Sequence, residues 1–287
     1  MSEPDVSSEA KAEASRKNRN LAVRAVTGFT LLPLVLFLVW KGGWWAGGLL
    51  ALAAAMNSGE YFQIVSRGKP DPLRWLGMGV AALIPLFPLL SPQRPWEAAF
   101  WLIAAFLIAV WAVVLIRGPH EEAPTRVAHL VTGVIYGASG MAAMAALRLD
   151  PVDGMAFAVA AMTITWGNDT SAYFFGRFLG KHKLAPTVSP NKTWEGFFGG
   201  MLGSVAGMFI ARGFFFPQLT VLDCLVLGFG GALLGPLGDL CESLLKRTYG
   251  VKDSGRSIPG HGGFLDRLDA LIFNAPLVFL YVEFLRP

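Results

Sequence analysis

The sequence has 287 residues, of which 54% are hydrophobic and only 15% charged, and its formal net charge is +4. Soluble domains average about 25% charged residues, so this chain has too little polar surface to enclose itself in water. Two cysteines exclude a disulfide scaffold, and the abundance of apolar residues excludes a disordered chain. A membrane protein with several spans is the class that remains.

Nine runs of mostly apolar residues predict membrane-spanning helices, since a hydrocarbon core of about 30 Å needs about 20 such residues. We therefore predict an all-α, polytopic membrane protein with about nine transmembrane helices. Their approximate ranges are 22–40, 43–57, 74–90, 96–116, 127–147, 152–175, 194–212, 219–238 and 267–285. Residues 1–20 are predicted to form a disordered cytoplasmic tail and not a signal peptide. Residues 21–150 hold about five of the helices, and residues 151–287 hold about four.

The positive charges lie mostly on one side of the predicted membrane. If the N-terminus is cytoplasmic and the spans alternate, 19 of the 24 Lys and Arg residues fall on the cytoplasmic side. The other side receives Lys41, Arg94, Arg148, Arg212 and Arg286. A missed or added span would mix the two groups, so the N-terminus is predicted inside and the C-terminus outside. The two longest polar loops, 176–193 and 239–266, are then both cytoplasmic, which indicates the functional face.

The first polar pattern lies where the eighth span continues into the cytoplasm as a helix. Asp239, Glu242 or Ser243, and Lys246 recur at spacings of three and four residues, which places them on one helix face. Ionisable groups at a membrane boundary are candidates for function. A simple ion pair between Lys246 and a carboxylate of this segment is the alternative explanation.

A second pattern is the turn-rich segment 257–269, which leads into the ninth span. Its glycines and proline surround His261, and open backbone amides near a helix start suit phosphate. Asp266 and Asp269 are spaced so that both can face one cation, and carboxylates without nearby thiols favour Mg²⁺ over zinc. The alternative is that Asp266 caps the helix and Arg267 anchors it at the membrane surface.

A third pattern begins at the end of the sixth span, where Asp169, Tyr173 and Arg177 share one helix face. The loop that follows contains three lysines and several hydroxyl groups, including Lys192 and Ser189. Such a loop suits a triphosphate or an anionic headgroup. An internally satisfied polar stripe and a basic loop touching anionic lipid are the alternatives.

These residues resemble the motifs of the phosphatidate cytidylyltransferase (CDP-diacylglycerol synthase) family. The longest block runs from Ser243 through Lys246-Arg247 and Lys252-Asp253-Ser254-Gly255 to residues 258–269. Two further blocks, residues 169–177 and 189–196, resemble the family as well, so the likeness covers the chain from about residue 160 to the end. In the N-terminal half the agreement is limited to the spans and to Glu60-Tyr61.

The resemblance implies transfer of a cytidylyl group from CTP to phosphatidate, giving CDP-diacylglycerol and diphosphate, with Mg²⁺ as cofactor. It also implies a homodimer in a bacterial-type cytoplasmic (inner) membrane, with the active site at the cytoplasmic face of the C-terminal half; no nucleic acid is expected as a partner. The expected catalytic residues are Asp239, Lys246, Asp266 and His261. The expected metal ligands are Asp239, Asp266, Asp269 and Asp169. The expected substrate-binding residues are Arg177, Ser189, Lys192, Ser243, Arg247, Lys252, Asp253 and Arg267.

Two other functions remain as alternatives. A CTP-dependent polyisoprenol kinase is similar in its C-terminal site, but it would release CDP and a phosphorylated alcohol. An ion-coupled transporter would need charges spread through the middle of several spans, whereas the acids here cluster at one face. The sequence does not decide which basic residues bind lipid and which bind nucleotide.

Overall fold

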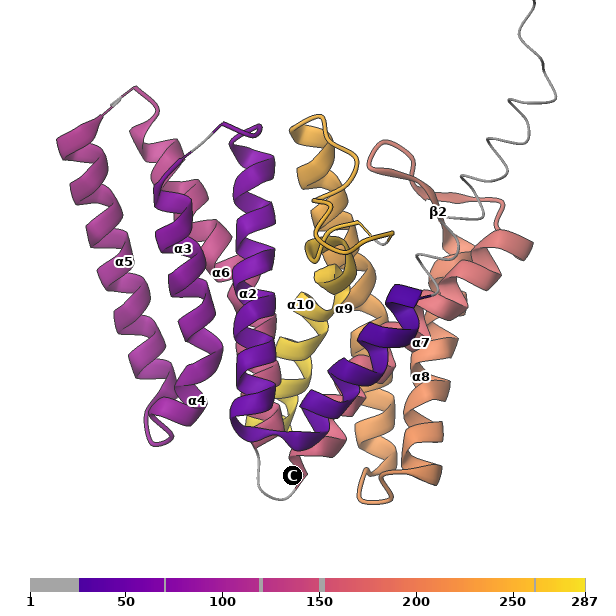
Figure 1. Cartoon of the computed structure of the whole chain (residues 1–287). Helices are drawn as coiled ribbons and strands as arrows, with labels where there is room; N and C mark the ends of the chain where they lie inside the picture. The colour runs from indigo at the N-terminus through magenta and orange to yellow at the C-terminus, as the bar shows by residue number, and fades with distance from the viewer. Residues whose placement is uncertain (1–25, 70, 119–120, 150–152, 261, 287) are drawn as a thin grey trace, which may run out of the picture.

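The computed structural model describes residues 26–69, 71–118, 121–149, 153–260 and 262–286. Most of these residues are helical, as Figure 1 shows. A first helix, Val26–Lys41, is followed by α2 (Gly43–Val65), α3 (Leu73–Leu83), η1 (Ile84–Leu86), α4 (Phe87–Leu90), α5 (Pro95–Arg117), α6 (Ala123–Leu149), α7 (Gly154–Leu179), β1 (Lys183–Ala185), β2 (Ser189–Thr193), α8 (Trp194–Phe214), α9 (Val221–Thr248), α10 (Leu265–Leu280) and the π-helical turn η2 (Tyr281–Leu285).

Each of the nine predicted apolar segments coincides with helical structure, but six are long and apolar enough to cross a membrane by length and composition. These are Leu73–Leu90, Pro95–Arg117, Ala123–Leu149, Trp194–Phe214, Val221–Thr248 and Leu265–Leu285. Helices α2 and α7 are not among the six, and both carry polar residues in their C-terminal halves. The structure thus has several helices that could span a membrane, and those polar residues belong to the site described below.

The expectation of a purely helical chain needs one correction. Residues 183–193 form a two-stranded antiparallel hairpin between α7 and α8, in which Lys183 pairs with Thr193 and Ala185 with Ser189. Thr193 then caps α8, because its side chain accepts a hydrogen bond from the backbone N–H of Gly196 at 3.1 Å. The hairpin therefore holds the predicted basic loop in a defined position.

One further difference concerns the third predicted span, whereas α9 agrees with its prediction. The third predicted span is divided into α3, η1 and α4, with prolines at positions 85 and 88. Helix α9 is continuous to Thr248, as the pattern of residues 238–247 predicted, and it begins with a capping box between Thr220 and Asp223.

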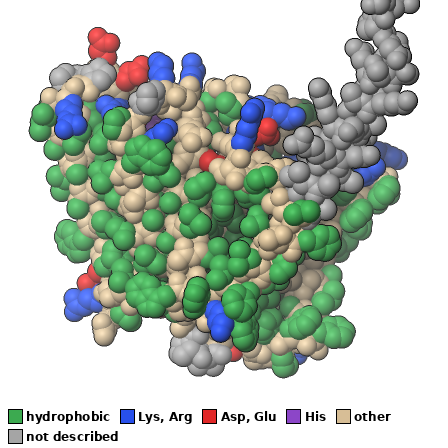
Figure 2. Space-filling model, viewed as in Figure 1, with side chains coloured by type: hydrophobic (Ala, Val, Ile, Leu, Met, Phe, Trp, Pro, Cys, Tyr) green, Lys and Arg blue, Asp and Glu red, His purple; other side chains and the backbone are tan. Residues whose placement is uncertain are grey.

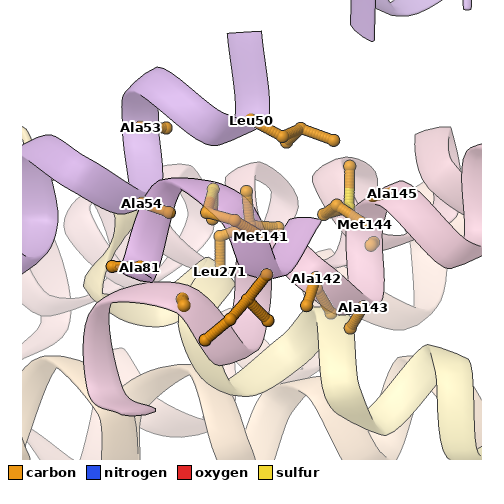
Figure 3. Packing of buried hydrophobic residues seen from close by; sticks show 14 of the residues in the cluster. Leu50, Ala53, Ala54, Ala81, Met141, Ala142, Ala143, Met144, Ala145 and Leu271 are labelled. Atoms are coloured by element: carbon orange, nitrogen blue, oxygen red, sulfur yellow. The ribbon is translucent and has the colours of Figure 1, made fainter. Parts of the chain in front are cut away.

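Helix α10 lies at the centre of the bundle although it comes last in the chain. It packs against α2, α6, α7 and α9, with α3 and α5 on one side in Figure 1 and α7 and α8 on the other. Figure 3 shows the core between α2, α6 and α10, where Ala54 and Met141 meet Leu271. Many of these core residues are alanines, whose small side chains let the helices approach closely.

The surface agrees with a protein that contacts lipid. On the face shown in Figure 2, hydrophobic side chains cover a broad middle band, and charged side chains gather toward the upper and lower edges.

At one end of the bundle, Arg126 of α6 donates hydrogen bonds of 2.6 and 2.7 Å to the carboxylate of Asp71. Burial alone would raise the pKa of Asp71, but the bonds from Arg126 and from the N–H of Leu73 lower it below its usual value.

Candidate active site

The last turns of α9 carry a row of polar side chains, as its spacing predicted. Asp239, Glu242, Ser243 and Lys246 lie on one side of the helix, and Ser243 donates a hydrogen bond of 3.2 Å to Asp239. The simple ion pair with Lys246 that the sequence offered as the alternative does form, but with Glu242 and not with Asp239. Asp239 pairs with Lys192 of β2 at 2.7 Å, because the hairpin brings a nearer cation to it.

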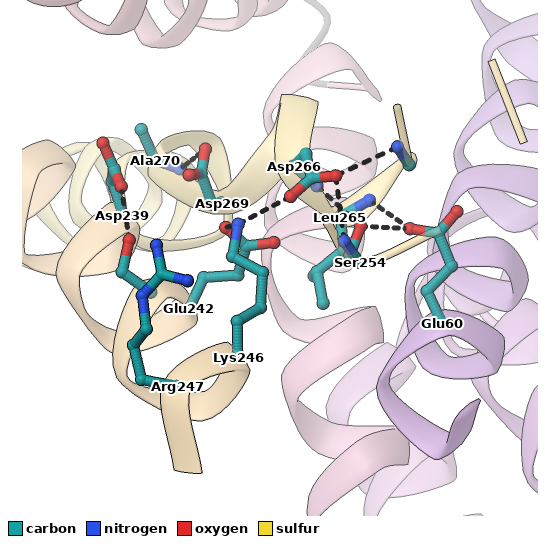
Figure 4. A network of polar contacts seen from close by, with 12 residues as sticks. Glu60, Asp239, Glu242, Lys246, Arg247, Ser254, Leu265, Asp266, Asp269 and Ala270 are labelled. Carbon is teal, nitrogen blue, oxygen red and sulfur yellow. Dashed lines mark hydrogen bonds and ion pairs between the residues drawn. The ribbon is translucent and has the colours of Figure 1, made fainter. Parts of the chain in front are cut away.

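Lys246 joins α9 to α10. Its ammonium lies 2.6 Å from Glu242 Oε2 and 2.6 Å from Asp266 Oδ1, as Figure 4 shows. All three side chains are almost withdrawn from solvent, with exposed fractions of 12%, 1% and 11% for Lys246, Glu242 and Asp266. Charged groups are stable at such a depth only when they are paired and hydrogen-bonded, so these three side chains hold one another in place.

Asp266 also orders the turn that precedes α10. Its Oδ2 accepts hydrogen bonds of 3.0 Å from the backbone N–H groups of Ser254 and Gly263. The alternative that Asp266 caps α10 is wrong, because the N-cap residue is Phe264 and the two N–H groups that Asp266 binds belong to residues that precede the helix. Gly260 and Gly262 adopt left-handed φ values of 76° and 86°, which glycine tolerates without strain.

Glu60 of α2 is a site residue that the sequence did not assign. Its side chain is only 2% exposed, and it accepts hydrogen bonds from the hydroxyls of Ser254 and Ser257 at 2.7 and 2.6 Å. It also accepts bonds from the backbone N–H groups of Phe264 and Leu265 at 3.0 and 2.9 Å. Among the described residues, no side chain at the start of α10 caps that helix from within. Glu60 supplies this cap from about 200 residues earlier in the chain.

Two glycines make room for Glu60. A side chain at Gly263 would collide with Ser254 Oγ and Glu60 Oε2, and one at Gly255 would collide with Glu60 Oε1. The glycine-rich segment that contains Gly255 and Gly263 therefore forms a turn folded around a buried carboxylate. The sequence signals for Glu60 were an isolated acid at the end of an apolar run and the family likeness at Glu60-Tyr61.

The acidic groups line a cavity of about 610 Å³, which we call the first cavity. Its lining consists of Asp239, Glu242, Lys246, Asp253, Gly260, Gly262, Asp266, Arg267 and Asp269. Five carboxylates face two cations there, a formal charge of −3. Glu242 Oε1 is buried and has no hydrogen-bond partner among the described residues. The first cavity is thus arranged to receive positive charge.

A neighbouring cavity of about 510 Å³, which we call the second cavity, lies between α7, the hairpin, α8 and α9. Its lining consists of Asn168, Asp169, Ala172, Tyr173, Gly176, Arg177, Leu184, Asn191, Lys192, Thr193, Gly196, Phe197, Pro236 and Asp239. Asp239 lines both cavities, so they adjoin at the Asp239–Lys192 ion pair. Arg177 donates a hydrogen bond of 2.6 Å to the hydroxyl of Tyr173, which confirms that these two residues share a helix face.

The four predicted metal ligands are divided between the cavities. Asp266 and Asp269 line the first, Asp169 lines the second, and Asp239 lines both. The charges of Asp169, Asp239 and Asp269 act on one another, which indicates that these carboxylates are near neighbours. Within the described residues, no three His, Cys, Asp or Glu side chains stand close enough to form a preassembled metal site.

The predicted substrate-binding residues fall into two groups. Arg177, Lys192, Asp253 and Arg267 line a cavity, and Ser243 contacts Asp239. Ser189, Arg247 and Lys252 do not line either cavity. Ser189 belongs to the paired strand β2, and Arg247 donates to the carbonyl of Val188 at 3.5 Å, which connects α9 with the hairpin. His261 lies outside the described residues.

Glu195 is a second residue that the sequence did not assign. It stands in the first turn of α8 and accepts hydrogen bonds from the backbone N–H groups of Lys181 and His182. His182 Nδ1 lies 2.6 Å from the same carboxylate. Glu195 therefore fastens the start of the hairpin to α8, and with it the position of Lys192.

The chain is similar in sequence to known cytidylyltransferases. Residues 22–285 match the sequence model of the cytidylyltransferase family. The chain is 33% identical over 270 residues to a phosphatidate cytidylyltransferase of Brucella abortus, covering 91% of this chain and 93% of that protein. It is 48% identical over 126 residues to a phosphatidate cytidylyltransferase of Staphylococcus epidermidis. That match spans 44% of this chain and about half of the staphylococcal protein, 48%.

Proposed function

The chain belongs to the cytidylyltransferase family, and from this premise we propose that it transfers the cytidylyl group of CTP to phosphatidate in phospholipid biosynthesis. The products are CDP-diacylglycerol and diphosphate. The observation that carries the proposal is the family match, because it spans every residue that lines the two cavities. The relatives named as phosphatidate cytidylyltransferases support the choice of substrates.

In the proposed reaction, an anionic oxygen of the lipid phosphate forms a bond to the α-phosphorus of CTP. The bond between that phosphorus and the oxygen bridging to the β-phosphate breaks, and diphosphate leaves with the electron pair. A phosphate monoester has a second pKa of about 6, so the nucleophile is largely ionised near neutral pH and needs no general base. The task of the protein is to bring two anions together and to stabilise the charge that develops.

The lining of the first cavity fits a divalent cation such as Mg²⁺. Its five carboxylates outweigh its two cations, so a bare triphosphate would be repelled. Carboxylate oxygens are the ligands that Mg²⁺ prefers, and Asp239, Asp266 and Asp269 would hold the ion in this cavity, with Asp169 of the adjoining second cavity as a further candidate. When bound, the ion supplies positive charge to the phosphate oxygens of the nucleotide.

Two cations of the first cavity, Lys246 and Arg267, would add positive charge near the nucleotide phosphates. Lys246 is held by Glu242 and Asp266, so its ammonium has a fixed position at the cavity wall, from which it would bind the nucleotide phosphates and the departing diphosphate. Arg267 lines the same cavity and would serve the same purpose. For His261 we retain the proposal that it donates a hydrogen bond to a phosphate oxygen.

The experiment that tests this function uses the purified full chain with labelled CTP, phosphatidate and Mg²⁺ in detergent micelles. We expect CDP-diacylglycerol and diphosphate in equal amounts. A parallel reaction with a polyisoprenol in place of phosphatidate tests for kinase activity. Release of CDP together with a phosphorylated alcohol, or the absence of a CDP-lipid in every detergent, would overturn the proposal.

We also propose nine spans, with the N-terminus and both cavities on the cytoplasmic side of a bacterial inner membrane. The distribution of Lys and Arg supports this orientation, and the agreement between the nine predicted segments and the helices supports the number. Single cysteines in the connections between helices, labelled from each side of sealed vesicles, test both. Light scattering of the purified protein tests the homodimer implied by the family.

A further inference from the structure

We propose that the second cavity binds the phosphate headgroup of the lipid substrate, while the first cavity receives the nucleotide with its cation. This inference rests on the proposed function and adds a division of labour between the two cavities. It begins from their charges. The second cavity carries two carboxylates, Asp169 and Asp239, and two cations, Arg177 and Lys192, so its formal charge is zero. A phosphate monoester that arrives without a cation is repelled far less there than in the first cavity.

Arg177 is the group best placed to recognise such a phosphate. Its guanidinium lies against the ring of Tyr173 at 5.9 Å and donates to the hydroxyl of that residue. No carboxylate forms an ion pair with Arg177 among the residues that the structure describes. A planar guanidinium with donors to spare binds phosphate oxygens in pairs, which suits a compact terminal phosphate.

Asn168 provides a second, independent observation. The residue is 2% exposed and lines the second cavity, yet its Nδ2 has no hydrogen-bond partner among the described residues. A buried amide donor left without a partner is costly, so a ligand oxygen that accepts from it would be bound favourably. Arg177 and Asn168 both line the second cavity although they are separated by about 13 Å along α7, so the cavity is an elongated site.

The surroundings of the second cavity suit a substrate with acyl chains. Its wall includes Ala172, Leu184, Phe197 and Pro236. On the outer surfaces of α7 and α8, large aromatic side chains are exposed, with fractions of 50% for Phe174, 73% for Phe178, 46% for Trp194 and 55% for Phe198. Exposed aromatic residues of this kind mark a surface that contacts lipid. A headgroup can therefore enter the cavity while its acyl chains stay in the bilayer.

The ion pair between Lys192 and Asp239 marks where the two substrates meet. Asp239 lines both cavities, and Lys192 lines only the second. A lipid phosphate beside Lys192 would face the nucleotide across this pair, which is the contact that the proposed phosphoryl transfer needs. The ammonium of Lys192 can shift its hydrogen bonds from Asp239 to the arriving phosphate without moving far.

The test separates the two Michaelis constants. In mixed micelles with Mg²⁺, we expect Arg177→Gln to raise the KM for phosphatidate about tenfold or more and to change the KM for CTP less than about twofold. Lys183→Gln is the matched control, because Lys183 is an exposed cation of the hairpin that follows α7 and lines neither cavity. An unchanged KM for phosphatidate in an active Arg177→Gln enzyme would overturn the inference and leave the proposed function intact.

A second variant and a binding measurement guard against misfolding. Asn168→Leu keeps the size of the side chain and removes the unpaired amide, and it should raise the KM for phosphatidate in the same direction. In the absence of CTP, short-chain phosphatidate should raise the melting temperature of the wild-type protein more than short-chain diacylglycerol does. Equal stabilisation by the two lipids would contradict a phosphate site. If the difference between the two melting temperatures disappears in Arg177→Gln, the phosphate binds at Arg177. A wild-type enzyme that makes no CDP-lipid would refute the proposed function itself.

Discussion

The carboxylate of Glu60 in α2 accepts a hydrogen bond of 2.9 Å from the backbone N–H of Leu265, the first residue of α10. This contact connects the N-terminal helices with the turn that carries Asp266. Because Glu60 also receives two serine hydroxyls and the N–H of Phe264, one buried carboxylate determines the path of the whole turn. The N-terminal half of the chain thus contributes directly to the geometry of the first cavity.

We expect Glu60→Gln to lower kcat at least about tenfold. The glutamine amide has the same size, but its NH₂ group would face donors and leave them without an acceptor, at a cost of about 1–3 kcal/mol. Trypsin should also cleave faster at Lys252 and Arg256, two exposed sites in the same loop. Glu97→Gln is the control, since Glu97 is 63% exposed and pairs only with Arg94 at the surface. Unchanged turnover and unchanged cleavage would show that the turn does not depend on Glu60.

Asp266→Asn should abolish turnover while the protein still folds and inserts. The remaining carbonyl oxygen can accept from the backbone of Ser254 or Gly263, but the ion pair with Lys246 and the charge offered to a cation are lost. Turnover and the elution profile in detergent are the two measurements. Normal activity in this variant would contradict the role of Asp266 in the first cavity.

Lys246→Met should abolish turnover and also destabilise the protein. Removing this ammonium leaves Glu242, which is 1% exposed, beside Asp266 without the shared cation. Breaking a buried ion pair from one side costs about 3–5 kcal/mol. Thermal unfolding in detergent should therefore occur at a clearly lower temperature than for Asp266→Asn, whereas equal melting temperatures would argue against the pairing.

Removal of divalent cations should stop the reaction, and added Mg²⁺ should restore it. Asp269→Asn, which takes one carboxylate from the first cavity, should raise the Mg²⁺ concentration that gives half-maximal rate. The wild-type enzyme assayed in a series of Mg²⁺ concentrations is the reference. Full activity in excess chelator would refute the metal requirement.

Gly263→Ala should disturb the turn around Glu60, because a Cβ atom there collides with Ser254 Oγ and Glu60 Oε2. We expect turnover to fall about tenfold or more, with faster cleavage by trypsin at Lys252. Gly79→Ala in α3 is the matched control, since a Cβ at Gly79 meets nothing within 4 Å. Alanine in that helix should be neutral or stabilise the protein by up to about 1 kcal/mol. Equal effects of the two substitutions would contradict the steric argument.

Local patterns in the sequence predicted much of this structure. Apolar runs located the helices, and the spacing of Asp239 and Lys246 placed both on the side of α9 that lines the first cavity. The sequence did not reveal that Lys192 is the partner of Asp239. The pair forms because the hairpin, which lies more than 40 residues before Asp239 in the chain, folds back against α9. Glu60 was missed for the same reason, since its partners lie about 200 residues later.

The central position of α10 has a consequence for how the protein is made. This helix is synthesised after α2, α6, α7 and α9, yet it packs against all four of them. Until residues 265–280 leave the ribosome, the faces of four earlier helices lack their common partner. The bundle can therefore close only after α10 has been made, and a chain truncated before Leu265 would leave these helix faces uncovered for chaperones and membrane proteases to recognise.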